Sequence, residues 1–199
     1  MNAKLIVPLV TFLLSLPATA CECLWEGSFA DIAPKVDYIV HGRIVQLKGN
    51  SLDLEVQREL KGTGHFDTVR IWLKTQDLCR AERDRFALEE QWVFALDRIN
   101  EIPDDGFNPM TPNISYGRVG DYSLAGCGGY FLPSDGRWIS GPIINATKWD
   151  FEPDTTPVLL ELIESYVQGQ ASRADLQEAT QMDPALRELM INTRLHVKP

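Results

Sequence analysis

The sequence predicts a mainly β protein in which a small five-stranded barrel is followed by a helical extension. Five segments between residues 36 and 127 are rich in β-branched residues or alternate apolar and polar residues, and turn residues separate them. After Pro153 the apolar residues recur instead at helical spacing. A two-sheet sandwich would normally need more strands than these, so the pattern favours a barrel.

The five strands are predicted from periodicity and from residue type. Leu52, Leu54 and Val56 alternate with polar residues, which is the period of a half-buried strand. The predicted strands cover residues 36–47, 52–60, 68–73, 91–96 and 116–127. Residues 100–113 are polar and contain proline, which predicts a long exposed loop. Residues 130–139 resemble a hairpin that turns at Asp135-Gly136.

Helices are predicted on both sides of the barrel. Ser28 can cap a short helix that ends near Pro34. Beyond the barrel, Thr156 and Pro157 can open a helix that Gly169 closes. Two further helix starts, at the capping-box-like residues 172–175 and at 183–184, complete a predicted helical extension over residues 151–199.

The first 20 residues have the composition of a secretory signal. Lys4 supplies a positive charge, residues 5–16 are nearly all apolar, and residues 17–20 end in small residues suited to cleavage. The apolar run is too short to span a bilayer, so no transmembrane anchor is expected. Such a signal would direct export to the periplasm or out of the cell, and cleavage after Ala20 would leave Cys21 as the first residue of the mature protein. A lipid anchor on Cys21 is the alternative, but the proline and alanine before the cleavage point stand where a lipoprotein signal has larger aliphatic residues.

Four cysteines follow the predicted signal, and an even number in an exported protein indicates disulfides. Only one residue separates Cys21 from Cys23, so a bridge between these two would be strained. Each is therefore expected to bond to Cys79 or to Cys127. A zinc site with four cysteine ligands would need a second close pair, which the sequence does not contain.

The charge balance limits the classes of partner. The chain has 28 acidic and 19 basic residues, a formal net charge of -9, which becomes -10 when Lys4 leaves with the signal. This excess of acid argues against nucleic acids and anionic membrane surfaces as partners. The sequence also contains no motif that calls for a cofactor.

No set of residues has the pattern of a catalytic centre. His41, His65 and His196 are widely separated and do not have the spacing of metal ligands. Gly126-Cys127-Gly128 resembles a nucleophile on a tight turn, but no base is near it in the sequence, and a disulfide-bonded Cys127 could not attack a substrate. We therefore expect a protein that is not an enzyme.

Several short motifs occur in a fixed order from Cys21 to about Pro133. They are Cys21-Glu22-Cys23, the short helix, the strand YIVHGRIV, the pair LDLEVQRELKG and DTVRIWLK, then Asp77-Leu78-Cys79, QWVFALDRI and Gly126-Cys127-Gly128-Gly129. In this order and spacing they resemble the netrin-like module of the tissue inhibitors of metalloproteinases, a five-stranded OB-fold barrel. The chain lacks the third disulfide of that module and the second, cysteine-rich subdomain of those inhibitors. It therefore resembles a minimal relative of the bacterial type, with the barrel domain at residues 21–150.

The resemblance implies a site at the start of the mature chain. Disulfides Cys21–Cys79 and Cys23–Cys127 would staple the N-terminus onto the barrel. The free amine and the carbonyl of Cys21 would then chelate the catalytic zinc of a metalloprotease, at the position that such a zinc keeps open for water. The protein would hold no metal of its own.

Glu22 would follow Cys21 into the specificity pocket of the protease, which is usually apolar. A carboxylate buried there would cost several kcal/mol unless a cation pairs with it. A netrin-like module that binds another protein outside the cytoplasm without inhibiting a protease is therefore the alternative.

Overall fold

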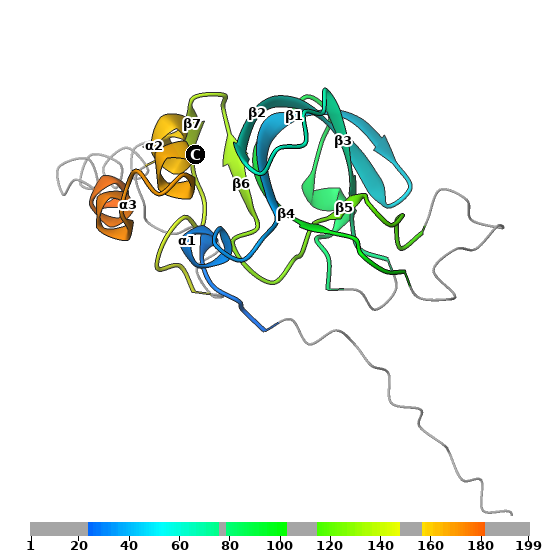
Figure 1. Cartoon of the computed structure of the whole chain (residues 1–199), viewed down its shortest axis with the longest axis horizontal. Helices are drawn as coiled ribbons and strands as arrows, with labels where there is room; N and C mark the ends of the chain where they lie inside the picture. The colour runs from blue at the N-terminus through cyan, green and yellow to red at the C-terminus, as the bar shows by residue number, and fades with distance from the viewer. Residues whose placement is uncertain (1–23, 76–78, 103–114, 148–156, 182–199) are drawn as a thin grey trace, which may run out of the picture.

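The chain folds into a closed five-stranded barrel whose sheet continues into three further strands (Figure 1). One short helix precedes these strands in the sequence, and two follow them. The computed structural model describes residues 24–75, 79–102, 115–147 and 157–181. The predicted mainly β barrel, with a short N-terminal helix and a C-terminal helical extension, is confirmed.

The barrel strands are β1 (Tyr38–Lys48), β2 (Ser51–Lys61), β3 (Thr68–Trp72), β4 (Gln91–Arg98) and β5 (Tyr122–Ser123). Around the barrel they follow the order β1-β2-β3-β5-β4, and β1 closes the ring by pairing with β4. All of these pairs are antiparallel except β3–β5, which is parallel. A five-stranded barrel with this non-sequential order is OB-fold-like.

Strand β1 can pair with β2 on one side and β4 on the other because it is bent. Its register against β2 shifts at three places, one of them between His41 and Gly42. Such bulges increase the local bend and twist of a strand and help a sheet to close. A Cβ atom on Gly42 would lie 2.2 Å from the carbonyl oxygen of Glu55, so only glycine fits at this close approach.

The sheet leaves the barrel through β4, which also pairs with β6 (Phe131–Ser134). Strands β6 and β7 (Trp138–Ile139) form the hairpin predicted from the sequence, with its turn at Asp135 and Gly136. Strand β8 (Val158–Leu159) pairs with β7 and leads directly into helix α2 (Leu160–Val167).

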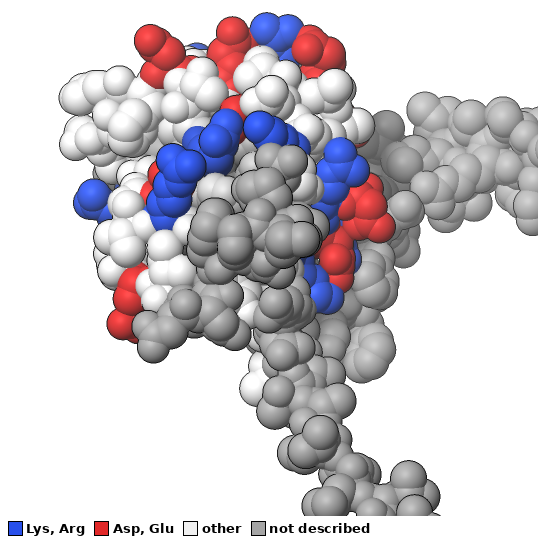
Figure 2. All heavy atoms as spheres, turned by 90° about the vertical axis from the view of Figure 1, so that its right-hand side faces the viewer, with Lys and Arg blue, Asp and Glu red and all other residues white. Residues whose placement is uncertain are grey.

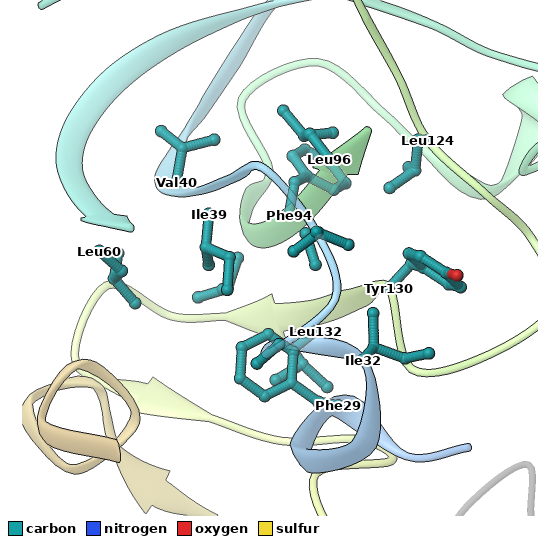
Figure 3. Close-up of a cluster of buried hydrophobic side chains, with 14 of the residues drawn as sticks. Phe29, Ile32, Ile39, Val40, Leu60, Phe94, Leu96, Leu124, Tyr130 and Leu132 are labelled. Atoms are coloured by element: carbon teal, nitrogen blue, oxygen red, sulfur yellow. The ribbon is translucent and has the colours of Figure 1, made fainter. Parts of the chain in front are cut away.

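One core joins the barrel, the added strands and the helices. Figure 3 shows Phe29 and Ile32 of helix α1 (Phe29–Ile32) beside Leu132 of β6, in the same cluster as Phe94 of β4. All four side chains are completely buried. The predicted capping of α1 is confirmed, because Asp31 accepts hydrogen bonds from the backbone N–H and the hydroxyl of Ser28, at 2.9 and 2.6 Å.

The first and the last described helices contact each other. The hydroxyl of Tyr166, in α2, donates a hydrogen bond to the carbonyl of Ala30 at 2.8 Å. Arg173, at the start of α3 (Arg173–Thr180), forms an ion pair with Asp31 at 2.7 Å. Helix α3 begins at the predicted capping box, in which Ser172 and Asp175 exchange hydrogen bonds. Helix α1 is therefore held between the barrel core and the two C-terminal helices.

Two predicted elements are shorter than expected. The fifth strand, predicted over residues 116–127, is reduced to β5, because Gly117 and Gly120 have φ angles of 104° and 94° that an extended strand does not allow. The helix predicted from Thr156 begins only at Leu160, because the two residues before it pair with β7. The predicted signal, most of the 100–113 loop and the helix start at Asp183-Pro184 lie outside the described residues.

His41 is a buried histidine of β1, only 3% exposed. Its Nε2 atom lies 3.0 Å from the hydroxyl oxygen of Ser134 in β6. Burial, and in second place the positive charge of Arg58, lower the pKa of His41 below its usual value.

We expect His41 to make the protein less stable in mild acid. The unfolded chain binds a proton at this position below about pH 6.5, whereas the folded chain keeps the ring neutral down to its lower pKa. The free energy of unfolding should therefore fall as the pH drops through this interval. Urea denaturation of the wild type and of His41→Gln at several pH values will check this, and His65→Asn, in an exposed loop, is the control. An equal pH dependence in wild type and His41→Gln would contradict the expectation.

Candidate functional site

The candidate site is the edge of the barrel where the N-terminal segment meets the two cysteines that the structure describes. We call it the N-terminal edge and define it as residues 24–27, 79–81 and 125–130. Backbone hydrogen bonds hold these three segments side by side. The predicted residues Cys21, Glu22 and Cys23 directly precede the first segment and lie outside the described residues.

The N-terminal segment is fixed by its backbone from Glu26 onward. The N–H of Glu26 donates to the carbonyl of Cys127 at 2.7 Å, and the carbonyl of Gly27 accepts from the N–H of Gly129 at 2.9 Å. The N–H of Phe29 then donates to the carbonyl of Pro142 at 2.8 Å. The chain is therefore anchored within a few residues of the position at which it is predicted to begin.

Two side chains add to this anchoring. The indole N–H of Trp25 donates to the carbonyl of Ala146 at 3.0 Å. The hydroxyl of Tyr130, which is almost fully buried, donates to the carboxylate of Glu26 at 2.5 Å. The side chain of Leu24, by contrast, is 78% exposed.

The two described cysteines lie on the same edge. The carbonyl of Cys79 accepts a hydrogen bond from the N–H of Gly126 at 3.0 Å, and Arg80 forms a β-bridge with Ala125. Both Cys79 and Cys127 are disulfide-bonded, and the described part of the chain contains no free cysteine. The pairing Cys21–Cys79 and Cys23–Cys127 stays a prediction, because Cys21 and Cys23 lie outside the described residues. A disulfide-bonded Cys127 is not a nucleophile.

Glycine is needed where the segments touch. A Cβ atom on Gly129 would lie 2.2 Å from the backbone nitrogen of Phe29 and 2.9 Å from the carbonyl oxygen of Pro142. A Cβ atom on Gly126 would lie 2.9 Å from the carbonyl oxygen of Arg80. The glycines around Cys127, which formed one of the motifs in the sequence, therefore let three backbones approach one another.

Glu26 of the N-terminal edge lies near two further acidic groups, Asp37 and Asp97. Burial raises the pKa of the Asp97 carboxyl, and the nearby carboxylates of Asp37 and Glu26 raise it further. Burial and the hydrogen bond to Glu26 raise the pKa of Tyr130, so its hydroxyl stays protonated as a donor. The face of the molecule in Figure 2 has a different charge pattern, because a band of Lys and Arg side chains runs across it.

The histidines of the sequence do not come together. His41 is buried beside Ser134, His65 lies in an exposed loop, and His196 is outside the described residues. In the part of the chain that is described, no three His, Cys, Asp or Glu side chains are placed to hold a metal ion. Within the same residues, no helix has both the length and the apolar character needed to cross a membrane.

Sequence reasoning missed Trp25, Glu26 and Tyr130 as parts of the site. Their hydrogen-bond partners are 121 positions away for Trp25 and 104 positions away for the pair of Glu26 and Tyr130. No local pattern reports contacts at such separations. The only signal was indirect, in the cluster of glycines that follows Leu124.

Comparison with known proteins adds no family to this description. No protein-family model matches the chain, and a search of the curated proteins finds no match. The resemblance to the netrin-like module therefore depends on the motifs in this sequence, and the OB-fold-like barrel on the strand order described above.

Proposed function

We propose that this protein is an exported, non-catalytic inhibitor of a zinc metalloprotease that binds through its N-terminal edge. The chelating groups would be the free amine and the carbonyl of Cys21, exposed by removal of residues 1–20. The observation that supports this proposal is the anchoring of the backbone at Glu26 beside Cys127, with Cys79 on the same edge.

The chemistry of the chelating group fits the task. A neutral amine and the adjacent carbonyl oxygen can occupy the open position of a catalytic zinc as a five-membered ring. An α-amino group has an ordinary pKa of about 8, so a useful fraction is neutral at physiological pH. Because the segment is anchored before any partner binds, little conformational entropy would be lost on association.

The acidic groups narrow the class of protease. Glu22 would enter the specificity pocket, and Glu26, four positions further along the chain, adds a second acidic residue, with the carboxyls of Asp37 and Asp97 close enough to Glu26 for their charges to interact. A target would therefore carry basic side chains in and around that pocket, because an unpaired carboxylate there would oppose binding.

The alternative is a netrin-like module that binds an extracytoplasmic protein without chelating zinc. The observation that favours it is the acidic residue at position 22, which an apolar specificity pocket would exclude. In that case the disulfides would serve only to hold the N-terminal segment on the barrel.

Two measurements test the proposal. Mass spectrometry of the exported protein will show whether Cys21 is the first residue and whether it carries a lipid. The protein is then titrated against a panel of zinc proteases that includes enzymes with basic specificity pockets. Inhibition by the native protein supports the proposal.

We expect modification of the N-terminus to weaken this inhibition by about 30-fold or more, since loss of a central contact costs about 2 kcal/mol or more. One altered form is N-acetylated, and another has one alanine inserted before Cys21. Both should keep the thermal stability of the native protein. Equal inhibition by native and acetylated forms, or none by either, would favour the alternative.

A further inference from the structure

A cleft beside β3 and β5 has no residue in common with the N-terminal edge and no part in the proposed inhibition. Its volume is about 230 Å³, and it lies between the loop before β3, the first half of β3 and the start of β5. The lining residues are Phe66, Thr68, Val69, Arg70, Gly120, Asp121 and Tyr122.

One wall of the cleft is aromatic. The ring of Phe66 is 44% exposed and meets the rings of Tyr38 and Tyr122 edge-on, with both centroid distances 6.4 Å. Tyr38 and Tyr122 are themselves stacked, with centroids 5.0 Å apart. Phe66 is therefore an exposed ring on a packed aromatic base.

Hydrogen bonds to Glu59 hold the loop that carries Phe66. A single carboxylate oxygen of Glu59 accepts hydrogen bonds from the N–H groups of Gly64 and His65, at 3.1 and 2.9 Å, and from the hydroxyl of Tyr38 at 2.5 Å. His65 has a φ of 50°, a conformation that costs free energy for a residue with a side chain. The loop thus presents the ring without further ordering when a ligand arrives.

The lining of the cleft also offers both a hydrogen-bond donor and an acceptor. Arg70 binds Asp53 through its Nε and Nη2 atoms, each at 2.7 Å, which fixes the guanidinium. Its Nη1 atom has no hydrogen-bond partner among the described residues. Asp121 accepts from the indole of Trp72 through Oδ2 at 2.7 Å and can accept again through Oδ1.

We propose that this cleft binds one pyranose ring of a neutral, β-linked oligosaccharide. The apolar face of such a ring would stack on Phe66, while its hydroxyl groups, which both donate and accept, would reach Arg70 and Asp121. The volume is below the range of about 300–1,000 Å³ that holds drug-sized ligands, and so suits a single ring.

Other ligand classes fit less well. An anion would need uncompensated positive charge, but Arg70 is neutralised by Asp53, and Asp121 lines the cleft as well. A nucleic acid is disfavoured by the net charge of -9. In OB-fold barrels in general, the face of strands 2 and 3 and the loop before strand 5 hold oligosaccharides or oligonucleotides, which agrees with the position of this cleft.

The full-length exported protein, labelled with ¹⁵N, is titrated with cellohexaose and chitohexaose, and with a heparin-derived hexasaccharide as an anionic probe. We expect a neutral probe to bind with a Kd of about 1 mM or tighter. The amide shifts should map to residues 66–70 and 120–122. No binding by either neutral probe, or binding by the anionic probe alone, would overturn the proposal.

Variants test the role of the ring. Phe66→Ala should weaken binding about tenfold or more, because stacking on an aromatic face is lost. Phe66→Leu, which keeps an apolar cover over Tyr38, should weaken binding similarly, and measurement of its Tm will check that the fold is intact. Trp138→Ala is the matched control, since Trp138 is equally exposed, at 44%, on β7. Equal affinity in wild type and Phe66→Leu would overturn the proposal.

Oligosaccharide binding at the cleft is independent of the proposed protease inhibition. Acetylation of the N-terminus should leave oligosaccharide binding unchanged, and Phe66→Leu should leave protease inhibition unchanged. Failure of one function can therefore be distinguished from failure of the other.

Discussion

Replacement of Gly129 by alanine is expected to lower the free energy of unfolding by about 3 kcal/mol or more. The added methyl group would lie 2.2 Å from the backbone nitrogen of Phe29, 2.7 Å from the carbonyl carbon of Ser28 and 2.9 Å from the carbonyl oxygen of Pro142. Backbone atoms cannot rotate away as a flexible side chain can. The backbone at Gly129 must therefore move away from the backbone at Ser28 and Phe29. The midpoint and the slope of urea denaturation, followed by tryptophan fluorescence, will measure the loss.

The neighbouring glycine provides the control for this prediction. A Cβ atom on Gly128 would lie 3.1 Å from its nearest neighbour, the carbonyl oxygen of Gly27, and small shifts can relieve that contact. Gly128→Ala should therefore cost only about 1 kcal/mol. If the two variants unfolded at the same urea concentration, the close packing at Gly129 would not be what holds the N-terminal edge together.

Phe29→Ala is expected to destabilise the protein by about 3–5 kcal/mol. The side chain is completely buried and lies between α1 and the β6 strand, beside Leu132 (Figure 3). Its removal leaves a cavity at the point where the N-terminal segment enters the core. Urea denaturation will again give the change in free energy.

Phe66→Ala is the matched change for Phe29→Ala, because it removes the same side chain from an exposed position. It should cost about 1 kcal/mol or less. A loss in Phe29→Ala as small as that in Phe66→Ala would mean that α1 contributes little to the stability of the barrel.

Features with a local cause could be predicted from the sequence. The alternation of Leu52 and Leu54 with polar residues predicted β2, and both leucines are completely buried. Ser28 predicted the start of α1, because the groups that cap it are three positions apart. The Asp135-Gly136 turn was also correct, since Gly136 adopts a φ of 97°.

Features that depend on residues far apart in the sequence, or on conformations that residue type does not fix, could not be predicted. The shortened fifth strand depends on glycine conformations that residue type permits but does not require. Strand β8 forms because a hairpin edge is available to Val158 and Leu159, and the 3-10 turn Arg83–Arg85 has no periodic pattern. The cleft at Phe66 joins residues of two loops that are more than 50 positions apart in the sequence.

The contact of α1 with α2 and α3 imposes an order of assembly on this chain. A ribosome makes the amino end first, but Ala30 and Asp31 find their partners only 136 and 142 positions later. Helix α1 therefore lacks these contacts until Tyr166 and Arg173 have been synthesised. Contacts between residues so far apart in the sequence slow folding. Chains cut short before Tyr166 would contain every residue of the N-terminal edge and still lack the support that sets its first helix.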